Sequence, residues 1–201
     1  MLRWRGLYAI VDPTCCKHDP VRTADGLLRG GAAVLQLRWK DGGDREQLAL
    51  GRALAQKCRA ADVPFVMNDR ADLARLAEAT GLHLGQDDLP VADARRVFSG
   101  PVGLSTHDLD QVRAARGADL IGFGPVFATA SKENPDPVVG LEGLRAACAE
   151  SSCPVVAIGG LTAERAPLAV EAGATLVAAI SALCGADDPE AAARAFAEAF
   201  A

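Results

Sequence analysis

The chain has 201 residues, of which 50% are apolar and 23% are charged, and its formal net charge is −5 at pH 7. This length suits one well-buried core rather than two domains, and the composition is typical of a globular protein and excludes a disordered or fibrous one. Lys and Arg are scattered among Asp and Glu, so no basic stripe could neutralise a nucleic-acid backbone, and nucleic acid is not expected as a partner.

Short apolar runs alternate with segments rich in Ala, Leu and Arg from one end of the chain to the other. The apolar runs predict eight strands, at residues 6–11, 34–40, 64–69, 81–85, 101–106, 120–127, 154–160 and 175–183. The segments between and after them predict helices at residues 24–30, 45–61, 71–79, 91–98, 109–116, 141–150, 163–172 and 189–200.

This alternation of strands and helices is typical of an α/β protein with a parallel sheet. Eight such units predict a single-domain (β/α)8 TIM barrel over residues 1–201. The main alternative is a doubly wound open sheet, which would concentrate its polar residues at one switch point. We favour the barrel because polar residues follow nearly every strand pattern, and in a barrel these residues converge on one mouth.

Nothing in the sequence predicts a membrane or secreted protein. No stretch approaches the roughly 20 apolar residues of a membrane span, and the first residues enter a strand without the pattern of a signal peptide. Six cysteines without a C-x-x-C pair are expected to be reduced thiols, so we expect a cytoplasmic protein with no membrane partner. Reactive thiols at Cys15 and Cys16 are the less favoured alternative, because only His18 lies nearby and no helix start lowers their pKa.

Two cations end the second strand pattern. Gln36, Arg38 and Lys40 alternate along it, so their side chains share one face of the strand. Two cations that face the barrel interior or its rim require an anion, which a substrate phosphate would supply. The structural alternative is a salt bridge with an acid on a neighbouring strand.

Two carboxylates end the third and fourth strand patterns, at Asp69 and Asp88. Oxygen ligands at neighbouring strand ends suit Mg²⁺, which usually shares them with substrate phosphates. The alternative is that each carboxylate caps the next helix, and for either residue alone the two interpretations are about even. Together with Arg38 and Lys40, the two acids predict a Mg²⁺-diphosphate site.

The last three strand patterns lead into segments that suit phosphate. A long polar loop follows the sixth, and its Thr129, Ser131 and Lys132 offer two hydroxyls and an ammonium, as a lid over the mouth would. A merely solvated loop is the alternative. Gly-Gly at 159–160 and Ile-Ser at 180–181 stand where barrels usually bind phosphate, after strands seven and eight.

The fifth strand pattern ends in Ser105 and Thr106 and is followed by His107. His107 is the only credible acid-base candidate among the histidines, because it follows a strand and can face the pocket. His83 lies inside a strand pattern and is expected to be a packed, hydrogen-bonded residue rather than a ligand.

The strand ends carry a series of motifs in a fixed order, namely Gln36-Leu37-Arg38-x-Lys40, Asn68-Asp69-Arg70-x-Asp72-Leu73-Ala74, His83-Leu84-Gly85-Gln86-x-Asp88, Gly103-x-Ser105-x-His107, Gly122-x-Gly124-Pro125-Val126-Phe127-x-Thr129-x-Ser131-Lys132, Ala157-Ile158-Gly159-Gly160 and Ile180-Ser181. No one motif is decisive, but their order and spacing together are highly specific. On these motifs the chain resembles the thiamine-phosphate synthase family over nearly its whole length. There are two departures from the family pattern. In the lid, Ala128 and Ser131 replace the family's usual Pro and second Thr, and Trp39 is bulky for a commonly polar position.

The resemblance implies a transferase that joins a hydroxymethylpyrimidine diphosphate to a thiazole phosphate and releases diphosphate by a dissociative, Mg²⁺-assisted mechanism. It implies small-molecule substrates and one Mg²⁺ per subunit, bound by Asp69 and Asp88. The implied pyrimidine-diphosphate contacts are Gln36, Leu37, Arg38, Trp39, Lys40, Asn68, Ser105 and Lys132. Of these, the implied catalytic residues are Arg38, Lys40, Ser105 and Lys132. The implied thiazole-phosphate contacts are Thr129, Ala130, Ser131, Gly160, Ile180 and Ser181.

Three other functions are compatible with such a barrel. A thiazole tautomerase of the same superfamily would transfer a proton through His107 and would have no use for a diphosphate site. A non-catalytic sensor of a phosphate ligand would have lost charged site residues, and none is lost. A sugar-phosphate epimerase or isomerase would show a paired acid-base constellation, which is not evident. The sequence leaves open whether the chain forms a homo-oligomer.

Overall fold

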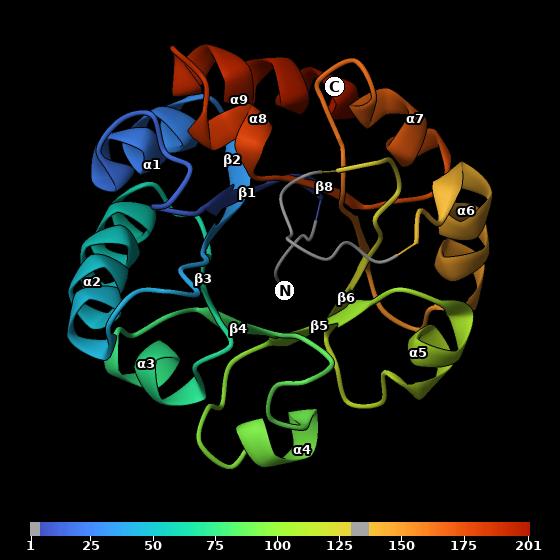
Figure 1. The fold of residues 1–201 in the computed structure, drawn as a ribbon, viewed down its shortest axis with the longest axis horizontal. Helices are drawn as coiled ribbons and strands as arrows, with labels where there is room; N and C mark the ends of the chain where they lie inside the picture. The colour runs from blue at the N-terminus through green and yellow to red at the C-terminus, as the bar shows by residue number, and fades with distance from the viewer. Residues whose placement is uncertain (1–4, 130–136) are drawn as a thin grey trace.

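The computed structural model describes residues 5–129 and 137–201, which form a ring of parallel strands surrounded by helices (Figure 1). The strands are hydrogen-bonded in chain order and β1 also pairs with β8, so the barrel is closed. The predicted (β/α)8 barrel is confirmed, and the open-sheet alternative is wrong. The strands are β1 (Gly6–Val11), β2 (Ala32–Leu37), β3 (Phe65–Asn68), β4 (Gly81–Leu84), β5 (Val102–Thr106), β6 (Leu120–Phe123), β7 (Val155–Ala157) and β8 (Leu176–Ala179).

The helices form the outer ring of the barrel (Figure 1). The first begins at Pro20, earlier than predicted, because Pro suits the first helical turn and the Asp19 side chain accepts hydrogen bonds from two amides of that turn. Within the described ranges, no helix is long and apolar enough to cross a membrane. The helices are α1 (Pro20–Arg29), α2 (Asp44–Ala60), α3 (Ala71–Leu76), α4 (Val91–Ala94), α5 (Leu109–Ala114), α6 (Gly140–Glu150), α7 (Ala166–Glu171), α8 (Ser181–Cys184) and α9 (Pro189–Ala197), with a 3₁₀ turn η1 (Glu198–Phe200).

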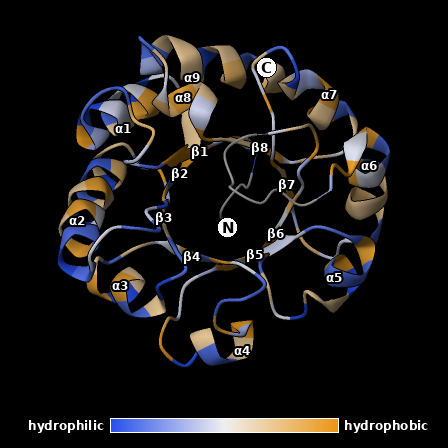
Figure 2. Cartoon of the chain, in the orientation of Figure 1, coloured by the Kyte–Doolittle hydropathy of each residue, from blue (hydrophilic) through white to orange (hydrophobic). Residues whose placement is uncertain are grey.

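Side chains alternate between two cores along each strand, because successive residues of a strand point to opposite faces. In β1, Tyr8 and Ile10 belong to the cluster inside the barrel, whereas Leu7 and Ala9 belong to the larger cluster between barrel and helices. Helices such as α2 and α5 accordingly carry both hydrophobic and hydrophilic residues (Figure 2). By the same alternation, Gln36 follows Val34 on the inward face of β2, and Arg38, directly after the strand, also lines the cavity.

Four predicted strands end three or four residues later than the real ones. The patterns were predicted to end at 40, 127, 160 and 183, but the chain leaves the sheet after Leu37, Phe123, Ala157 and Ala179. The residues beyond these points include buried apolar ones such as Val126 and Leu161, and the last pattern continues into α8. A short apolar run does not distinguish a strand from a buried loop or helix, so the sequence placed these loop residues in the sheet.

Candidate active site

A cavity of about 140 Å³ opens at the carboxyl ends of the strands. Residues from all eight strands, and from the loops after β6 and β7, meet in it, as the barrel prediction requires. Among the predicted site residues, those that line it are Gln36, Arg38, Asn68, Ser105, Thr129, Gly160, Ile180 and Ser181.

A chain of hydrogen bonds fixes one wall of the cavity. The buried Tyr8 hydroxyl donates to Gln36 Oε1 at 2.7 Å, and Gln36 Nε2 donates to Asn68 Oδ1 at 2.9 Å. Burial raises the pKa of Tyr8, so its hydroxyl remains a donor at neutral pH. The two partners fix the orientation of the Gln36 amide, which makes this wall a preorganised polar surface.

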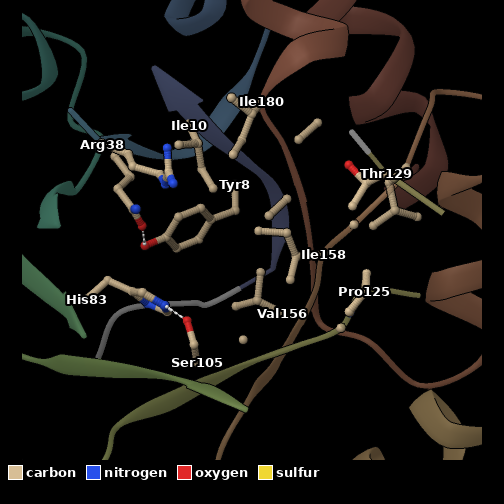
Figure 3. Close-up of a pocket in the computed structure, with 18 of the residues that line it drawn as sticks. Tyr8, Ile10, Arg38, His83, Ser105, Pro125, Thr129, Val156, Ile158 and Ile180 are labelled. Atoms are coloured by element: carbon tan, nitrogen blue, oxygen red, sulfur yellow. Dashed lines mark hydrogen bonds between the residues drawn. The ribbon is translucent and has the colours of Figure 1, made fainter. Parts of the chain in front are cut away.

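A second polar pair, His83 and Ser105, lies beside this wall. His83 Nε2 and Ser105 Oγ are 2.9 Å apart, and both residues line the cavity (Figure 3). Burial lowers the pKa of His83 to about 4, so the ring is neutral at pH 7. His83 is hydrogen-bonded, as the sequence predicts, but it also contributes to the cavity wall, which the sequence did not indicate.

The depressed pKa of His83 predicts a pH dependence of stability. In the unfolded chain the ring titrates near 6.5 and in the fold near 4. Between these values the unfolded state binds more protons, so the free energy of unfolding falls as the pH is lowered from 6.5 to 4. In urea unfolding at several pH values, we expect the unfolding free energy of His83→Gln to fall less than that of the parent as the pH is lowered from 6.5 to 4. A variant whose pH dependence matches that of the parent would contradict the assignment.

Arg38 is held by an acid that the sequence analysis did not single out. Its Nη1 donates to Asp12 Oδ2 at 2.5 Å, and the two side chains are only 19% and 7% exposed. Asp12 follows directly after β1, so the strand-end rule that selected the other site residues also selects this one. Asp12 Oδ1 accepts hydrogen bonds from the backbone and hydroxyl of Thr14, which fixes the carboxylate.

Lys40, Asp69 and Asp88 form a second charged group, next to Asn68 at the rim. Lys40 Nζ lies 2.7 Å from Asp69 Oδ2. Lys40 therefore forms the salt bridge with a neighbouring acid that the sequence left open as an alternative, and Arg38 forms one with Asp12. Burial raises the pKa of Asp69 to about 6, and contact with the Asp88 carboxyl adds to the rise, while Lys40 opposes it. Two carboxylates in contact carry more negative charge than one ammonium balances.

The helix-cap alternative for the two acids is wrong. The residues that cap α3 and α4 are Arg70 and Pro90, and neither helix start has a side-chain capping bond. Asp88 Oδ2 instead accepts from the Gly85 amide at 2.6 Å. Asp69 has a φ of +62°, which is uncommon outside glycine. Backbone strain of this kind costs about 1–3 kcal/mol and is concentrated at functional sites.

The donor set at this rim fits Mg²⁺ in its usual setting. In the part of the chain that the structure describes, no group of three or more His, Cys, Asp or Glu could hold a metal ion. Mg²⁺ is commonly bound through only one or two carboxylates, with substrate phosphates and waters completing its shell. The contact between Asp69 and Asp88 suits that arrangement and does not suit a closed cage of protein ligands.

Closely packed glycine loops form the other end of the cavity. Gly160 has a φ of +61°, and a Cβ there would meet the Ala128 carbonyl oxygen at 2.4 Å. The Phe127 amide donates to the Gly159 carbonyl at 3.0 Å, so the loops after β6 and β7 are in direct backbone contact. Arg165, which the sequence did not indicate, donates to the Gly160 carbonyl at 2.7 Å. A side chain at position 160 would therefore displace this loop.

Gly160→Ala can be compared with Gly140→Ala, a matched control. Both positions have a positive φ, but a Cβ at Gly140 has nothing within 4 Å. We expect the control to cost about 1 kcal/mol of unfolding free energy and Gly160→Ala to cost about 3 kcal/mol, because the clash adds to the strain. Gly160→Ala should also weaken binding of a phosphate ligand, as titration calorimetry would measure. Equal effects of the two variants would contradict the close packing.

The two ends face each other across an apolar middle. In Figure 3, Arg38 and His83 lie on one side of the cavity, Thr129 lies on the other, and Val156 and Ile158 lie between them. Such a cavity suits a ligand pair with an anionic group at each end and flat, largely apolar rings in the middle.

Comparison with known proteins identifies the family. Residues 7–183 match the family model described as thiamine monophosphate synthase. The chain belongs to the thiamine monophosphate synthase family. Membership makes it a transferase of thiamine biosynthesis, as the resemblance implied.

Individual relatives agree with this membership. A thiamine-phosphate synthase from Chlorobium luteolum is 45% identical over 181 residues, which cover 88% of this chain and 85% of that protein. One from Synechococcus is 43% identical over 178 residues, but this chain spans only about half (50%) of its length. The structure of a thiamine phosphate pyrophosphorylase from Pyrococcus furiosus has a TM-score of 0.90 and 34% identity, and the match covers 98% of this chain and 96% of that one.

Some residues that the family resemblance assigns to the substrates lie away from the cavity. Leu37 is 1% exposed and packs between barrel and helices, and Trp39 packs against the same cluster. A Cβ on Gly42 would meet the Trp39 ring at 2.4 Å, so Trp39 fills space behind the loop that carries Lys40. Lys40, which was predicted to share a strand face with Gln36 and Arg38, comes after the end of β2 at Leu37 and is not among the residues that line the cavity. Ala130, Ser131 and Lys132 lie outside the described ranges.

Proposed function

We propose that this member of the thiamine monophosphate synthase family condenses 4-amino-2-methyl-5-hydroxymethylpyrimidine diphosphate with a thiazole phosphate. The products would be thiamine phosphate and diphosphate, with CO₂ as well if the thiazole carries a carboxyl group. One observation carries the proposal, namely a single cavity with Arg38 and Asn68 at one end, where Asn68 leads directly into the Lys40–Asp69–Asp88 group, and with the glycine loops at the other end.

The cationic end would hold the diphosphate. Arg38, positioned by Asp12, and Lys40, positioned by Asp69, would contact its oxygens. Mg²⁺ held by Asp69 and Asp88 would neutralise negative charge on the departing diphosphate. Because these charges are in place before the reaction, they favour the state in which negative charge develops on the leaving oxygen.

The polar wall would orient the pyrimidine. Gln36 and Asn68 present amide groups whose positions are fixed by their own hydrogen bonds, and Ser105 is positioned by neutral His83. Amide and hydroxyl groups of this kind match the nitrogens of an aminopyrimidine ring. The ring would then lie with its methylene carbon toward the thiazole, in an orientation that lowers the entropic part of the barrier.

The chemistry needs no strong base. The C–O bond of the pyrimidine methylene would break first, and its electron pair would leave with the diphosphate. The electron-rich aminopyrimidine would stabilise the resulting pyrimidinylmethyl cation, and the lone pair of the thiazole nitrogen would then form the C–N bond. That nitrogen carries no proton, so preorganised charge rather than a catalytic dyad would provide the rate enhancement.

The glycine end would hold the thiazole phosphate. Gly160, Thr129 and Ser181 line this end of the cavity, and the close packing of Gly160 against the loop after β6 would keep this end in place for a ligand. Ile180 would pack against the thiazole ring, because it continues the apolar cluster inside the barrel.

Incubation with both substrates and Mg²⁺, followed by chromatographic assay of thiamine phosphate, tests this function. We expect product only when both substrates and the metal are present. The tautomerase alternative predicts instead that thiazole phosphate alone exchanges a carbon-bound proton in D₂O. In that case His107, whose Nδ1 lies 2.7 Å from the Gly124 carbonyl oxygen, would be the group to replace. Exchange without condensation would refute the proposal.

A further inference from the structure

Three cysteines from opposite ends of the chain meet beside the first strand. Cys15 and Cys16 lie in the loop that leads from β1 to α1, and Cys184 ends α8, which packs beside β1 (Figure 1). The Lys17 amide donates to the Cys184 carbonyl at 2.9 Å, so the backbone of the loop is hydrogen-bonded to the end of the helix. None of these thiols has a role in the proposed condensation.

The thiols converge on the backbone around Asp12. Cys184 Sγ lies 3.3 Å from the Ile10 carbonyl oxygen and 3.5 Å from the Asp12 amide nitrogen. Cys15 Sγ lies 3.4 Å from the Asp12 carbonyl oxygen. Cys184 also lowers the pKa of the Cys15 and Cys16 thiols, so it lies near both of them. The side chains of Cys15 and Cys184 therefore both contact the backbone of Asp12, and a disulfide requires the two side chains to approach each other in this way.

The members of the cluster differ in exposure and reactivity. Cys15 is exposed, whereas Cys184 is buried. The contact with Cys184 lowers the pKa of the Cys15 thiol, with help from Arg38, although burial and Asp12 oppose the shift. By contrast, burial alone raises the pKa of Cys148 to about 11. An accessible thiol with a lowered pKa beside a second thiol is the usual arrangement of an oxidisable pair.

We propose that Cys15 and Cys184 form a reversible disulfide when the protein meets hydrogen peroxide. The Cys15 thiolate would attack one peroxide oxygen, giving a sulfenic acid and, after protonation, one water. The Cys184 sulfur would then attack the sulfenic sulfur, the S–S bond would form, and the hydroxyl would leave as a second water. Two thiols are thereby oxidised by two electrons and one peroxide is reduced; a dithiol reductant reverses the change.

The disulfide would affect the site, if the proposed condensation is correct. Asp12 positions Arg38 and is itself bonded to Thr14, the residue before Cys15. Pulling Cys15 toward Cys184 would disturb that carboxylate, and α8 also begins with Ser181 in the cavity wall. We therefore expect the oxidised protein to turn over at least about fivefold more slowly, because small displacements of positioned groups are costly in rate.

Peptide mapping tests the disulfide without any activity assay. The reduced full-length protein is treated with hydrogen peroxide, alkylated and digested with trypsin. Cleavage after Arg and Lys leaves Cys15 and Cys16 in peptide 6–17 and Cys184 in peptide 166–194, while Cys148 and Cys153 share peptide 146–165. We expect a species joining 6–17 to 166–194, about 2 Da lighter than their sum, which dithiothreitol separates. Its absence would overturn the proposal.

Two variants and a matched control assign the partners. Cys184→Ser and Cys15→Ser should each abolish the joined peptides, whereas Cys153→Ser should form them as the parent does. A cross-link that persists in Cys15→Ser would overturn the assignment of Cys15. In the parent, peroxide should slow condensation and dithiothreitol should restore it; an unchanged rate would overturn the effect on the site. If the proposed function is itself wrong, the reduced protein makes no thiamine phosphate, but the cross-link still forms.

Discussion

Replacement of either rim acid, by Asp69→Asn or Asp88→Asn, is expected to lower the rate of thiamine phosphate formation about a hundredfold or more, because a Lewis acid contributes several kcal/mol to such a transition state. Each substitution keeps the size of the side chain and removes the charge that would hold Mg²⁺. Initial rates measured over a range of Mg²⁺ concentrations give both the loss and any weakening of metal binding.

Two controls separate a metal defect from a folding defect. Asp87→Asn, at the exposed neighbour of Asp88, should have the parent rate. Asp69→Asn should be at least as stable as the metal-free parent at pH 7, because the raised pKa of Asp69 means that the fold disfavours its ionised form. Parent-like turnover in either acid variant would refute the metal-ligand assignment.

Arg38→Met is expected to lower both activity and stability. Removing Arg38 leaves the Asp12 carboxylate, which is 7% exposed, without its partner. Loss of one member of a buried pair costs about 3–5 kcal/mol, and the less buried position of Arg38 favours the lower end of that range. We also expect turnover to fall about a hundredfold, because one positioned cation would be missing from the leaving diphosphate.

The double variant Asp12→Asn with Arg38→Met separates the two effects of Arg38. Neutralising Asp12 removes the unpaired charge, so most of the lost unfolding free energy should return in a urea titration. The rate of condensation should not return, because the cation is still absent. Recovery of activity together with stability would mean that Arg38 has only a structural role.

The sequence predicted the fold well because the βα alternation is strong throughout. Gln36 and Arg38 were predicted to share a face of their strand, and both line the cavity. The two acids could not be told from helix caps by sequence, because a carboxylate after a strand and before a helix satisfies both interpretations. The capping residues of α3 and α4, which depend on the folded structure, exclude the helix-cap interpretation for Asp69 and Asp88, and the Mg²⁺ interpretation stays a prediction.

Other parts of the site depend on contacts that local sequence does not reveal. Tyr8 was not predicted because it lies inside an apolar strand pattern, whereas Asp12 directly follows the first strand and could have been predicted by the strand-end rule. His83 was interpreted only as a packed residue, since its position inside a strand gave no sign of the cavity. The thiol cluster joins Cys15 to Cys184, which lie 169 residues apart in sequence, so no local pattern could predict it.

The central claim is that one cavity couples departure of diphosphate to formation of the carbon–nitrogen bond. Phosphorus NMR of a single reaction with both substrates and Mg²⁺ follows diphosphate and thiamine phosphate at the same time. The account predicts that they appear together in equal amounts, and that neither forms when the thiazole phosphate or the metal is omitted. Diphosphate that accumulates without thiamine phosphate, or no reaction at all with both substrates present, would contradict it.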